Sequence, residues 1–279
     1  MIQIIFNKIG TPILALISLL LFILETKFQL RKRIQKRFSR IVINVFVSIP
    51  AFVLLRFAFL PIIVWLAFKN QDWQFGLNYF YSSPLWAMSI IAFLILDYGN
   101  YLWHILNHKI PFLWRFHLVH HTDIDMDITT AFRFHFGELI GSVFFRGGVT
   151  LLSGASPVLV LVYEIIFEAA TQFHHSNWKL PLAFEQILNK LIVTPRMHGL
   201  HHSVVKQETD SNYSVIFSFW DRLHRTATLE NLNKEVVLGV PSYNKPEELT
   251  IGFLLKLPFT KIRSWKKAEA ANTHEIPKE

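Results

Sequence analysis

The sequence predicts an all-α integral membrane protein with about four transmembrane helices, the last pair a hairpin, and a cytosolic helical cap rich in histidine. Three observations lead to this prediction. Apolar residues make up 52% of the 279 residues and charged residues only 17%. Four apolar stretches are long enough to enter a bilayer. Eleven of the thirteen histidines lie between residues 104 and 202, most of them in tight clusters.

The first three apolar stretches are expected to be membrane helices. Residues 11–26 are weakly charged on their N-terminal side and no small-x-small cleavage site follows, which favours an uncleaved anchor over a signal peptide. Residues 41–68 contain Arg56 as their only charge, and residues 85–107 are apolar until Asp97. About 20 apolar residues span the hydrocarbon core, so the second and third stretches are predicted to cross it.

The fourth apolar stretch, residues 138–173, is interrupted by Ser-Gly-Ala-Ser-Pro at residues 153–157. Each half has roughly 15 to 19 residues, which is marginal for a full crossing. We therefore expect a helical hairpin that enters and leaves on the same side of the membrane. Gly147 and Gly148 are expected to let the two halves pack closely.

The orientation follows from a basic loop at residues 27–40, which contains seven Lys and Arg residues. The positive-inside rule places this loop in the cytoplasm. The next two spans return the chain to the cytoplasmic side at His104 and His108, and a hairpin returns it there again at His174. A single crossing would instead separate the clusters by about 30 Å of hydrocarbon. All histidine clusters are therefore predicted to meet on the cytoplasmic side.

The composition also narrows the classes of partner. The net charge is +8, but no basic stripe with interleaved aromatic residues stands apart from the apolar segments, so nucleic acid is not an expected partner. Anionic lipid headgroups account for the same charge. Because the chain has no cysteine, it has neither disulfides nor thiolate ligands for a metal.

The histidine clusters have the spacing of metal-binding helices. Histidines three or four residues apart share one helix face, and neutral imidazole is a common ligand of iron, zinc and copper. The candidate ligands are His104, His108, His117, His120, His121, His174, His175, His198, His201 and His202. This number suits two metal ions. Adjacent residues diverge by about 100° on a helix, so only one of His174 and His175 needs to bind.

Neighbouring residues support these clusters. Asp97 shares a helix face with His104 and could accept a hydrogen bond from the free ring N–H of a ligating histidine. Thr194 and Pro195 mark the start of a helix just before the last cluster. His135 and Glu138 form a further polar group, for which a loop role and a role beside the metal ligands stay equally open.

The motifs resemble those of the fatty acid hydroxylase and sterol desaturase superfamily of membrane di-iron enzymes. The resemblance runs from about Asp97 to Thr226 and rests mainly on His104-x-x-x-His108, His117-x-x-His120-His121, His175-Ser176-Asn177 and Pro195-x-x-His198-x-x-His201-His202. It implies a four-helix membrane fold, two iron ions, and dioxygen-dependent hydroxylation or desaturation of a lipid C–H bond. All candidate histidines except His174 carry over as ligands, and Asp97 and Asn177 are the candidate catalytic residues. The chain departs from the pattern at His224 and Arg225, where many members have Phe-Gly.

The resemblance also suggests how the chain is organised. Residues 1–84 would form N-terminal anchor helices and the basic loop, residues 85–226 the catalytic domain, and residues 227–279 a polar cytoplasmic tail with one apolar run at 251–259. Zinc has no redox chemistry, so it would only substitute for iron. The sequence contains no flavin fingerprint, haem domain or cysteine-ligated iron–sulfur motif. We therefore expect an external electron donor, either a reductase or a cytochrome- or ferredoxin-type carrier, beside dioxygen and a lipid from the bilayer.

Two alternatives remain open. A histidine-rich membrane metal transporter would hold its ligands near the bilayer midplane. A haem-binding electron-transfer protein would use paired histidines on facing helices as axial ligands.

Overall fold

The computed structural model describes residues 6–80, 84–229 and 232–265. These residues are arranged in helices and connecting loops, with three isolated β-bridges and no strand. The all-α prediction is confirmed. Three helical segments are long and apolar enough to cross a membrane: Lys8–Lys27, Arg37–Tyr79 and Leu85–Lys109. They contain the first three stretches expected from the sequence.

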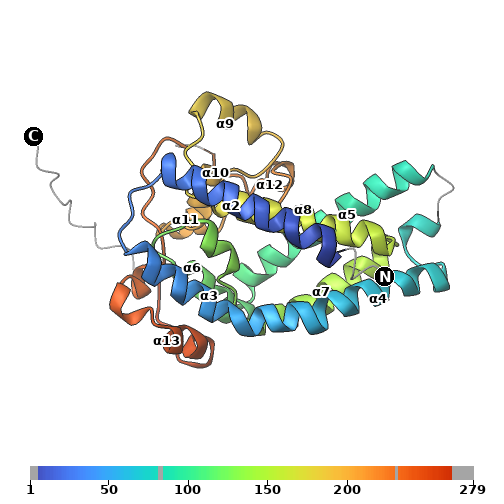
Figure 1. The fold of residues 1–279 in the computed structure, drawn as a ribbon, viewed down its shortest axis with the longest axis horizontal. Helices are drawn as coiled ribbons and strands as arrows, with labels where there is room; N and C mark the ends of the chain where they lie inside the picture. Colours follow the sequence, from blue (N-terminus) through green and yellow to red (C-terminus); the bar gives the residue numbers. More distant parts are fainter. Residues whose placement is uncertain (1–5, 81–83, 230–231, 266–279) are drawn as a thin grey trace, which may run out of the picture.

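The N-terminal part forms two rods joined by the basic loop. A π-helical turn, η1 (Phe6–Gly10), leads into α2 (Thr11–Lys27). Helix α3 (Arg37–Leu54) continues through a π-helical turn, η2 (Leu55–Phe59), into α4 (Leu60–Trp73), so the three form one long rod (Figure 1). A short 3-10 turn, η3 (Leu77–Tyr79), precedes α5 (Leu85–Lys109), which runs back along the rod and ends in His104 and His108.

Helix α7 (Phe136–Ser153) ends and α8 (Pro157–His175) begins at the break that the sequence predicts at residues 153–157. Gly154 ends α7 in the left-handed region with a φ of 67°, a conformation that favours glycine. The prediction that Gly147 and Gly148 let α7 and α8 pack closely was wrong. A Cβ on Gly147 would lie 3.0 Å from Leu66 on α4, and one on Gly148 would meet nothing within 4 Å, so neither residue serves contact between α7 and α8.

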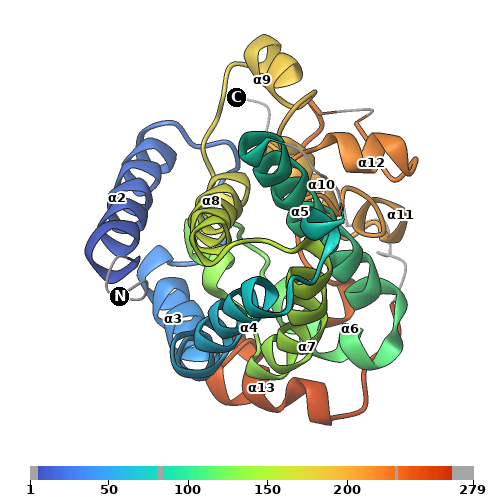
Figure 2. The same ribbon diagram turned by 90° about the vertical axis from the view of Figure 1, so that its right-hand side faces the viewer.

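A core of four helices, α4, α5, α7 and α8, positions the site. Viewed end-on, α8 lies near the middle, with α2, α4 and α5 around it (Figure 2). The buried residues of this core are Phe59, Ile63, Ala67, Ala92, Leu96, Ala155, Val160, Tyr163 and Ile216. Gly99 brings α5 and α7 close together, because a Cβ there would lie 2.6 Å from the side chain of Val149.

The remaining segments build a cap at one end of this core. Helix α6 (Pro111–His121) follows α5 directly, and the 3-10 turn η4 (Ile128–Phe132) lies before α7. Short helices then follow in order: α9 (Leu182–Leu188), α10 (Pro195–His201), α11 (Lys206–Thr209), α12 (Phe219–Leu223), η5 (Pro241–Tyr243), η6 (Pro246–Glu248), α13 (Ile251–Lys256) and η7 (Leu257–Phe259). The apolar run at 251–259 packs on the cap, since Leu254 and Leu257 are fully buried against Val47 and Leu118.

Candidate metal centre

Nine of the ten candidate histidines converge in two groups at the cap end of the helical core. Site A is formed by His104, His108, His117, His121 and His201, and site B by His120, His175, His198 and His202. Within each site, one nitrogen from every ring lies within 4.8 Å of the others. These candidate ligands come from the ends of α5 and α8, from α6, and from α10 with the residue that follows it.

The two histidine triplets are each divided between the sites. His117 and His121 enter site A, whereas His120 between them enters site B. The second triplet does the reverse, with His198 and His202 in site B and His201 in site A. Residues four apart share a helix face, while adjacent residues diverge by about 100°. Each triplet therefore contributes to both sites and holds them side by side.

The spacing of the ring nitrogens suits a bound metal ion. The Nε2 atoms of His117 and His121 are 3.2 Å apart, and Nε2 of His175 lies 3.0 Å from Nε2 of both His120 and His198. Metal–nitrogen bonds of about 2.1 Å place neighbouring ligands roughly 3.0 to 3.4 Å apart. Several buried ring nitrogens have no hydrogen-bond partner among the described residues, including Nε2 of His104, His108, His201 and His202. A metal ion in each site would satisfy them.

The opposite ring nitrogens are held by protein oxygens. Nδ1 of His104 lies 2.8 Å from the carbonyl oxygen of Tyr213, that of His175 lies 2.7 Å from Thr171, and that of His201 lies 2.6 Å from Ser211. A carbonyl can only accept, so in each case Nδ1 carries the proton and Nε2 keeps its lone pair. This arrangement orients imidazoles for metal binding.

Burial also favours the neutral form of several of these imidazoles. All nine rings are buried, the most exposed residue being His104 at 8%. Burial first, and then repulsion between neighbouring imidazoles, hold the pKa of His120, His121, His198 and His202 well below the ordinary value of 6.5. Neutral rings near pH 7 are free to bind metal without first losing a proton.

The two sites are direct neighbours. The rings of His121 in site A and His202 in site B are stacked, with centroids 4.4 Å apart. His120 and His121 have centroids 5.5 Å apart and face different sites. A substrate atom or a small molecule between the sites would thus be within reach of both.

His174 is the tenth candidate, and it lies outside both groups. Its Nδ1 donates to the carbonyl oxygen of Val215 at 3.1 Å, and its ring lies 4.1 Å from that of His198. The expectation that only one residue of the adjacent pair His174 and His175 would face the metals is consistent with this placement. His174 supports the ring of His198 by packing.

The two candidate catalytic residues contact neither site. Asp97 accepts hydrogen bonds from Trp220 Nε1 at 2.8 Å and from the backbone N–H of Phe217 at 3.3 Å, so the expected bond from a ligating histidine is not formed. The carboxylate instead fastens α12 to α5. Asn177 exchanges two hydrogen bonds of 2.9 Å with the backbone of Arg31, which attaches the basic loop to the end of α8.

Other polar residues take positions that the sequence left open. His135 caps α7 by accepting from Gly137 N–H, and its Nε2 lies 3.1 Å from the carbonyl oxygen of Leu255, so its role is structural. His224 is exposed and stacks on Tyr98 and Tyr101. Thr194 occupies the N-cap of α10 but its side chain makes no capping hydrogen bond. His274 lies outside the described residues.

Three side chains lie beside the candidate ligands, and the sequence left such a role open for Glu138 but gave no such role to the other two. Glu138 Oε1 lies 3.1 Å from Nδ1 of His117, and Asp210 lies 3.5 Å from Nδ1 of His108. Tyr213 packs against His104, His108 and His201, and its buried hydroxyl has no partner among the described residues. The contact of Glu138 agrees with the role beside the candidate ligands that the sequence left open, but the sequence did not show that its partner would be His117, 21 residues away.

Glu138→Ala should lower metal affinity. The change removes the acceptor that holds His117 in the tautomer required for binding, and such partners are worth about 10–100-fold in metal affinity. Metal titration of the purified apo-protein, followed by elemental analysis, checks this. Glu138→Gln keeps an oxygen acceptor and should restore most of the affinity. Equal affinities in Glu138→Ala and the unaltered protein would contradict the assignment.

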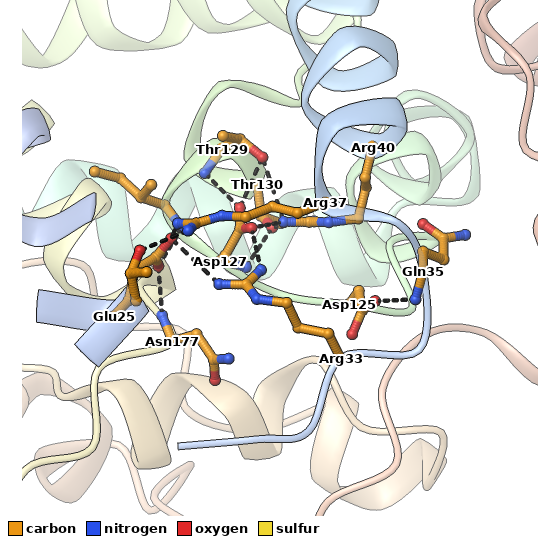
Figure 3. A network of polar contacts seen from close by, with 12 residues as sticks. Glu25, Arg33, Gln35, Arg37, Arg40, Asp125, Asp127, Thr129, Thr130 and Asn177 are labelled. Atoms are coloured by element: carbon orange, nitrogen blue, oxygen red, sulfur yellow. Dashed lines mark hydrogen bonds and ion pairs between the residues drawn. The ribbon is translucent and has the colours of Figure 1, made fainter. Parts of the chain in front are cut away.

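A buried network of charges fastens the basic loop to the site. Arg33 and Arg40 bind Asp127, and Arg37 binds Glu25 (Figure 3). Arg40 also donates to Asp123 at 2.6 Å, two residues after His121. Arg40 of α3 and Arg33 of the basic loop therefore connect this part of the chain to the loop that follows the first histidine triplet. Some of the positive charges that predict a cytoplasmic orientation of the loop are thus paired with buried carboxylates inside the protein.

Two adjacent buried histidine clusters lie at the ends of membrane-length helices, an arrangement that could hold two metal ions. Residues 89–226 match the family model described as fatty acid hydroxylase. The chain belongs to the fatty acid hydroxylase and sterol desaturase superfamily.

Curated relatives agree with this family. The chain is 30% identical to human (Homo sapiens) alkylglycerol monooxygenase over 150 residues, which are 53% of this chain and 32% of that protein. It is 28% identical to a cholesterol 25-hydroxylase-like protein of Danio rerio, with 49% and 54% covered. It is 30% identical to the ornithine lipid hydroxylase OlsE of Rhizobium tropici, with 50% and 41% covered. The chain thus spans about a third to a half of these relatives, and no solved structure is significantly similar to it.

Proposed function

We propose that this chain is a membrane-bound lipid hydroxylase that uses two iron ions and dioxygen to oxidise an unactivated C–H bond. The observation that carries the proposal is the pair of adjacent, buried sites made only of histidine. The relatives support it, because their names describe oxygenation of an alkylglycerol, of cholesterol and of an ornithine lipid. These substrates share only their lipid character, so we propose a lipid without choosing its class.

Sites A and B would each hold one iron. Bound iron supplies the redox chemistry needed to activate dioxygen, which zinc lacks. The protein's own residues fix the geometry: the nine imidazoles present lone pairs, and the oxygens of Tyr213, Thr171 and Ser211 hold three of the rings in the required tautomer. Burial of the ligands keeps bulk water from the reacting atoms.

We further propose that α2, the α3–α4 rod, α5 and the α7–α8 hairpin lie in the membrane with both sites on the cytoplasmic side. Outward-facing apolar side chains on the hairpin support this, with Phe144 78% and Val158 62% exposed. The two charges deepest in the hairpin, Arg146 and Glu164, pair with each other. Ligands at helix ends, rather than at mid-helix, favour this arrangement over a transporter.

A lipid chain could approach from the bilayer through an apolar groove. The groove has a volume of about 160 Å³ and is lined by Leu54, Ala58, Leu139, Ile140, Val143 and Phe144. Leu139 directly follows Glu138, which contacts His117 of site A. We propose that this groove takes part of the acyl or sterol chain of the substrate. Electrons would come from a separate donor protein.

The proposed function is tested with iron-loaded, full-length protein in lipid nanodiscs of different lipid classes. The protein is supplied with a chemical reductant and isotopically labelled dioxygen, and extracted lipids are analysed by mass spectrometry. We expect one class to gain a hydroxyl group that contains the labelled oxygen. Loss of hydrogen without oxygen gain would indicate desaturation instead. Protein that binds two irons yet alters no lipid would contradict the proposal.

A further inference from the structure

Two tryptophans connect site A with the surface of the cap. Trp114 on α6 packs directly against two metal-site rings, with centroid distances of 4.9 Å to His108 and 5.3 Å to His121. The ring of Trp265 lies 6.3 Å from that of Trp114. Both indoles are partly buried, so Trp265 brings an aromatic edge to the surface. The two rings form a short aromatic path from the solvent side to the ligands.

This path is held in place by specific contacts. Trp265 Nε1 donates to the carbonyl oxygen of Val204 at 3.2 Å, next to α11. The backbone N–H of Arg263 donates to the hydroxyl of Tyr243 at 2.7 Å. Arg115 donates to the carbonyl oxygens of Pro258 and Thr260 at 2.7 and 2.6 Å. The C-terminal segment therefore crosses the cap along a defined line and delivers Trp265 to Trp114.

The surface around this path is positively charged toward solvent. The ammonium group of Lys206 lies 5.0 Å from the ring of Trp114 and 4.9 Å from that of Trp265. Four cations here, Lys109, Lys206, Lys234 and Arg263, pair with Asp210, Glu208 and Glu248. The side chains of the cations are 40–55% exposed, whereas those of the acids are 15–29% exposed. The four cations are thus more exposed than the three acids with which they pair, so an approaching protein meets more positive than negative charge.

We propose that this surface, formed by Trp265, Lys206, Lys109, Lys234 and Arg263, docks an acidic one-electron carrier protein. Electrons then reach site A through Trp265 and Trp114, because aromatic rings in series shorten the gaps that an electron must cross. The inference rests on the proposed function, whose balance is R–H + O₂ + 2e⁻ + 2H⁺ → R–OH + H₂O. The carrier loses one electron at each encounter, and water supplies the protons.

The position of this surface suits a water-soluble carrier. Helix α11, which bears Lys206, lies in the half of the molecule away from the junction between α4 and α5 (Figure 1). It belongs to the cap, where it contacts α10, and is separate from the helices proposed to lie in the bilayer. A carrier in the aqueous phase would reach Trp265 without entering the membrane.

The docking step is tested by charge reversal. The full-length, metal-loaded protein is titrated in detergent with a plant-type [2Fe–2S] ferredoxin as the acidic probe. A basic c-type cytochrome serves as the control probe of opposite charge. Lys206→Glu combined with Lys234→Glu should weaken ferredoxin binding about tenfold at low ionic strength and reduce its salt dependence. Lys190→Glu makes the same change at an exposed site after α9 and should bind like the unaltered protein. Unchanged affinity in the double variant, or equal binding of both probes, would overturn the docking surface.

The electron path is tested by stopped-flow spectroscopy. For Trp265→Leu and Trp265→Phe, the rate at which reduced ferredoxin, present at saturating concentration, is reoxidised by the protein is measured. For each variant, this rate is divided by the rate at which dithionite reduces the same protein. We expect a lower ratio for Trp265→Leu and partial recovery for Trp265→Phe, which keeps an aromatic ring. A ratio for Trp265→Leu equal to that of the unaltered protein overturns the path. If dithionite itself fails to reduce the metal-loaded protein, the proposed function fails instead.

Discussion

His120→Ala and His201→Ala should each lose metal and lipid-dependent oxygen consumption. His120 is one of four imidazoles in site B, and His201 is one of five in site A. Each change leaves a buried site short of a ligand, and the loss should exceed the roughly 10–100-fold effect typical of residues that only support a ligand. Elemental analysis of tag-free protein should fall from about two irons per chain toward one. The two variants should deplete different sites, so their combination should hold almost no metal.

His174→Ala is the matched control for these variants. His174 is a buried histidine next to His175, but it lies outside both sites. The change removes an imidazole of equal size and burial, and the protein should keep most of its iron. Metal loss as large as in His120→Ala would show that His174 is a ligand and that the set of nine ligands is incomplete. Retention of iron in His120→Ala would instead contradict site B.

Arg40→Ala should destabilise the protein by about 3–5 kcal/mol, the usual cost of removing one partner from a buried ion pair. Arg40 is 1% exposed and binds both Asp123 and Asp127. Its loss leaves two carboxylates buried beside the loop that follows His121. Thermal unfolding in detergent measures the effect. Lys36→Ala, an exposed change in the same basic segment, should unfold like the unaltered protein.

A conservative substitution of Arg40 and the pH dependence of stability test the same ion-pair network. Arg40→Lys keeps the charge but not the forked geometry, so it should recover only part of the stability. Burial alone would raise the pKa of Asp127, but Arg40, Thr129 and Arg33 outweigh it and lower that pKa to about 2. Since this lies below the ordinary value of 3.8, the stabilisation is present above about pH 4 and is lost as the pH falls toward 2. An Arg40→Ala protein as stable as its parent would show that the network does not hold the cap.

The local pattern of the sequence accounts for the helices and for the histidines that form sites A and B. Apolar length and the break at 153–157 predict the membrane-length helices and the α7–α8 pair, because helix formation and chain reversal depend on neighbouring residues. The spacing of the histidines identifies all nine members of sites A and B. The spacing also selects His174, which lies outside both sites, because spacing along a helix does not reveal which side of the helix faces a neighbour.

Only the tertiary structure decides which residues meet. Asp97 shares a helix face with His104, yet it accepts from Trp220, 123 residues away, because α12 packs against that part of α5. The loop cations, which composition assigns to lipid headgroups, pair in part with buried carboxylates. Trp265 reaches Trp114 only because the apolar run at 251–259 packs on the cap.

The division of ligands between the two metal sites shows the same limit. Sequence spacing determines that His117 and His121 share a face and that His120 does not. It cannot show that the outlying histidine of one triplet joins the outer pair of the other, since this depends on how α6 and α10 lie against α5 and α8. The sequence by itself thus determined, through local periodicity, the helices and the nine histidines that cluster. The packing of distant helices decided that these ligands form two adjacent sites.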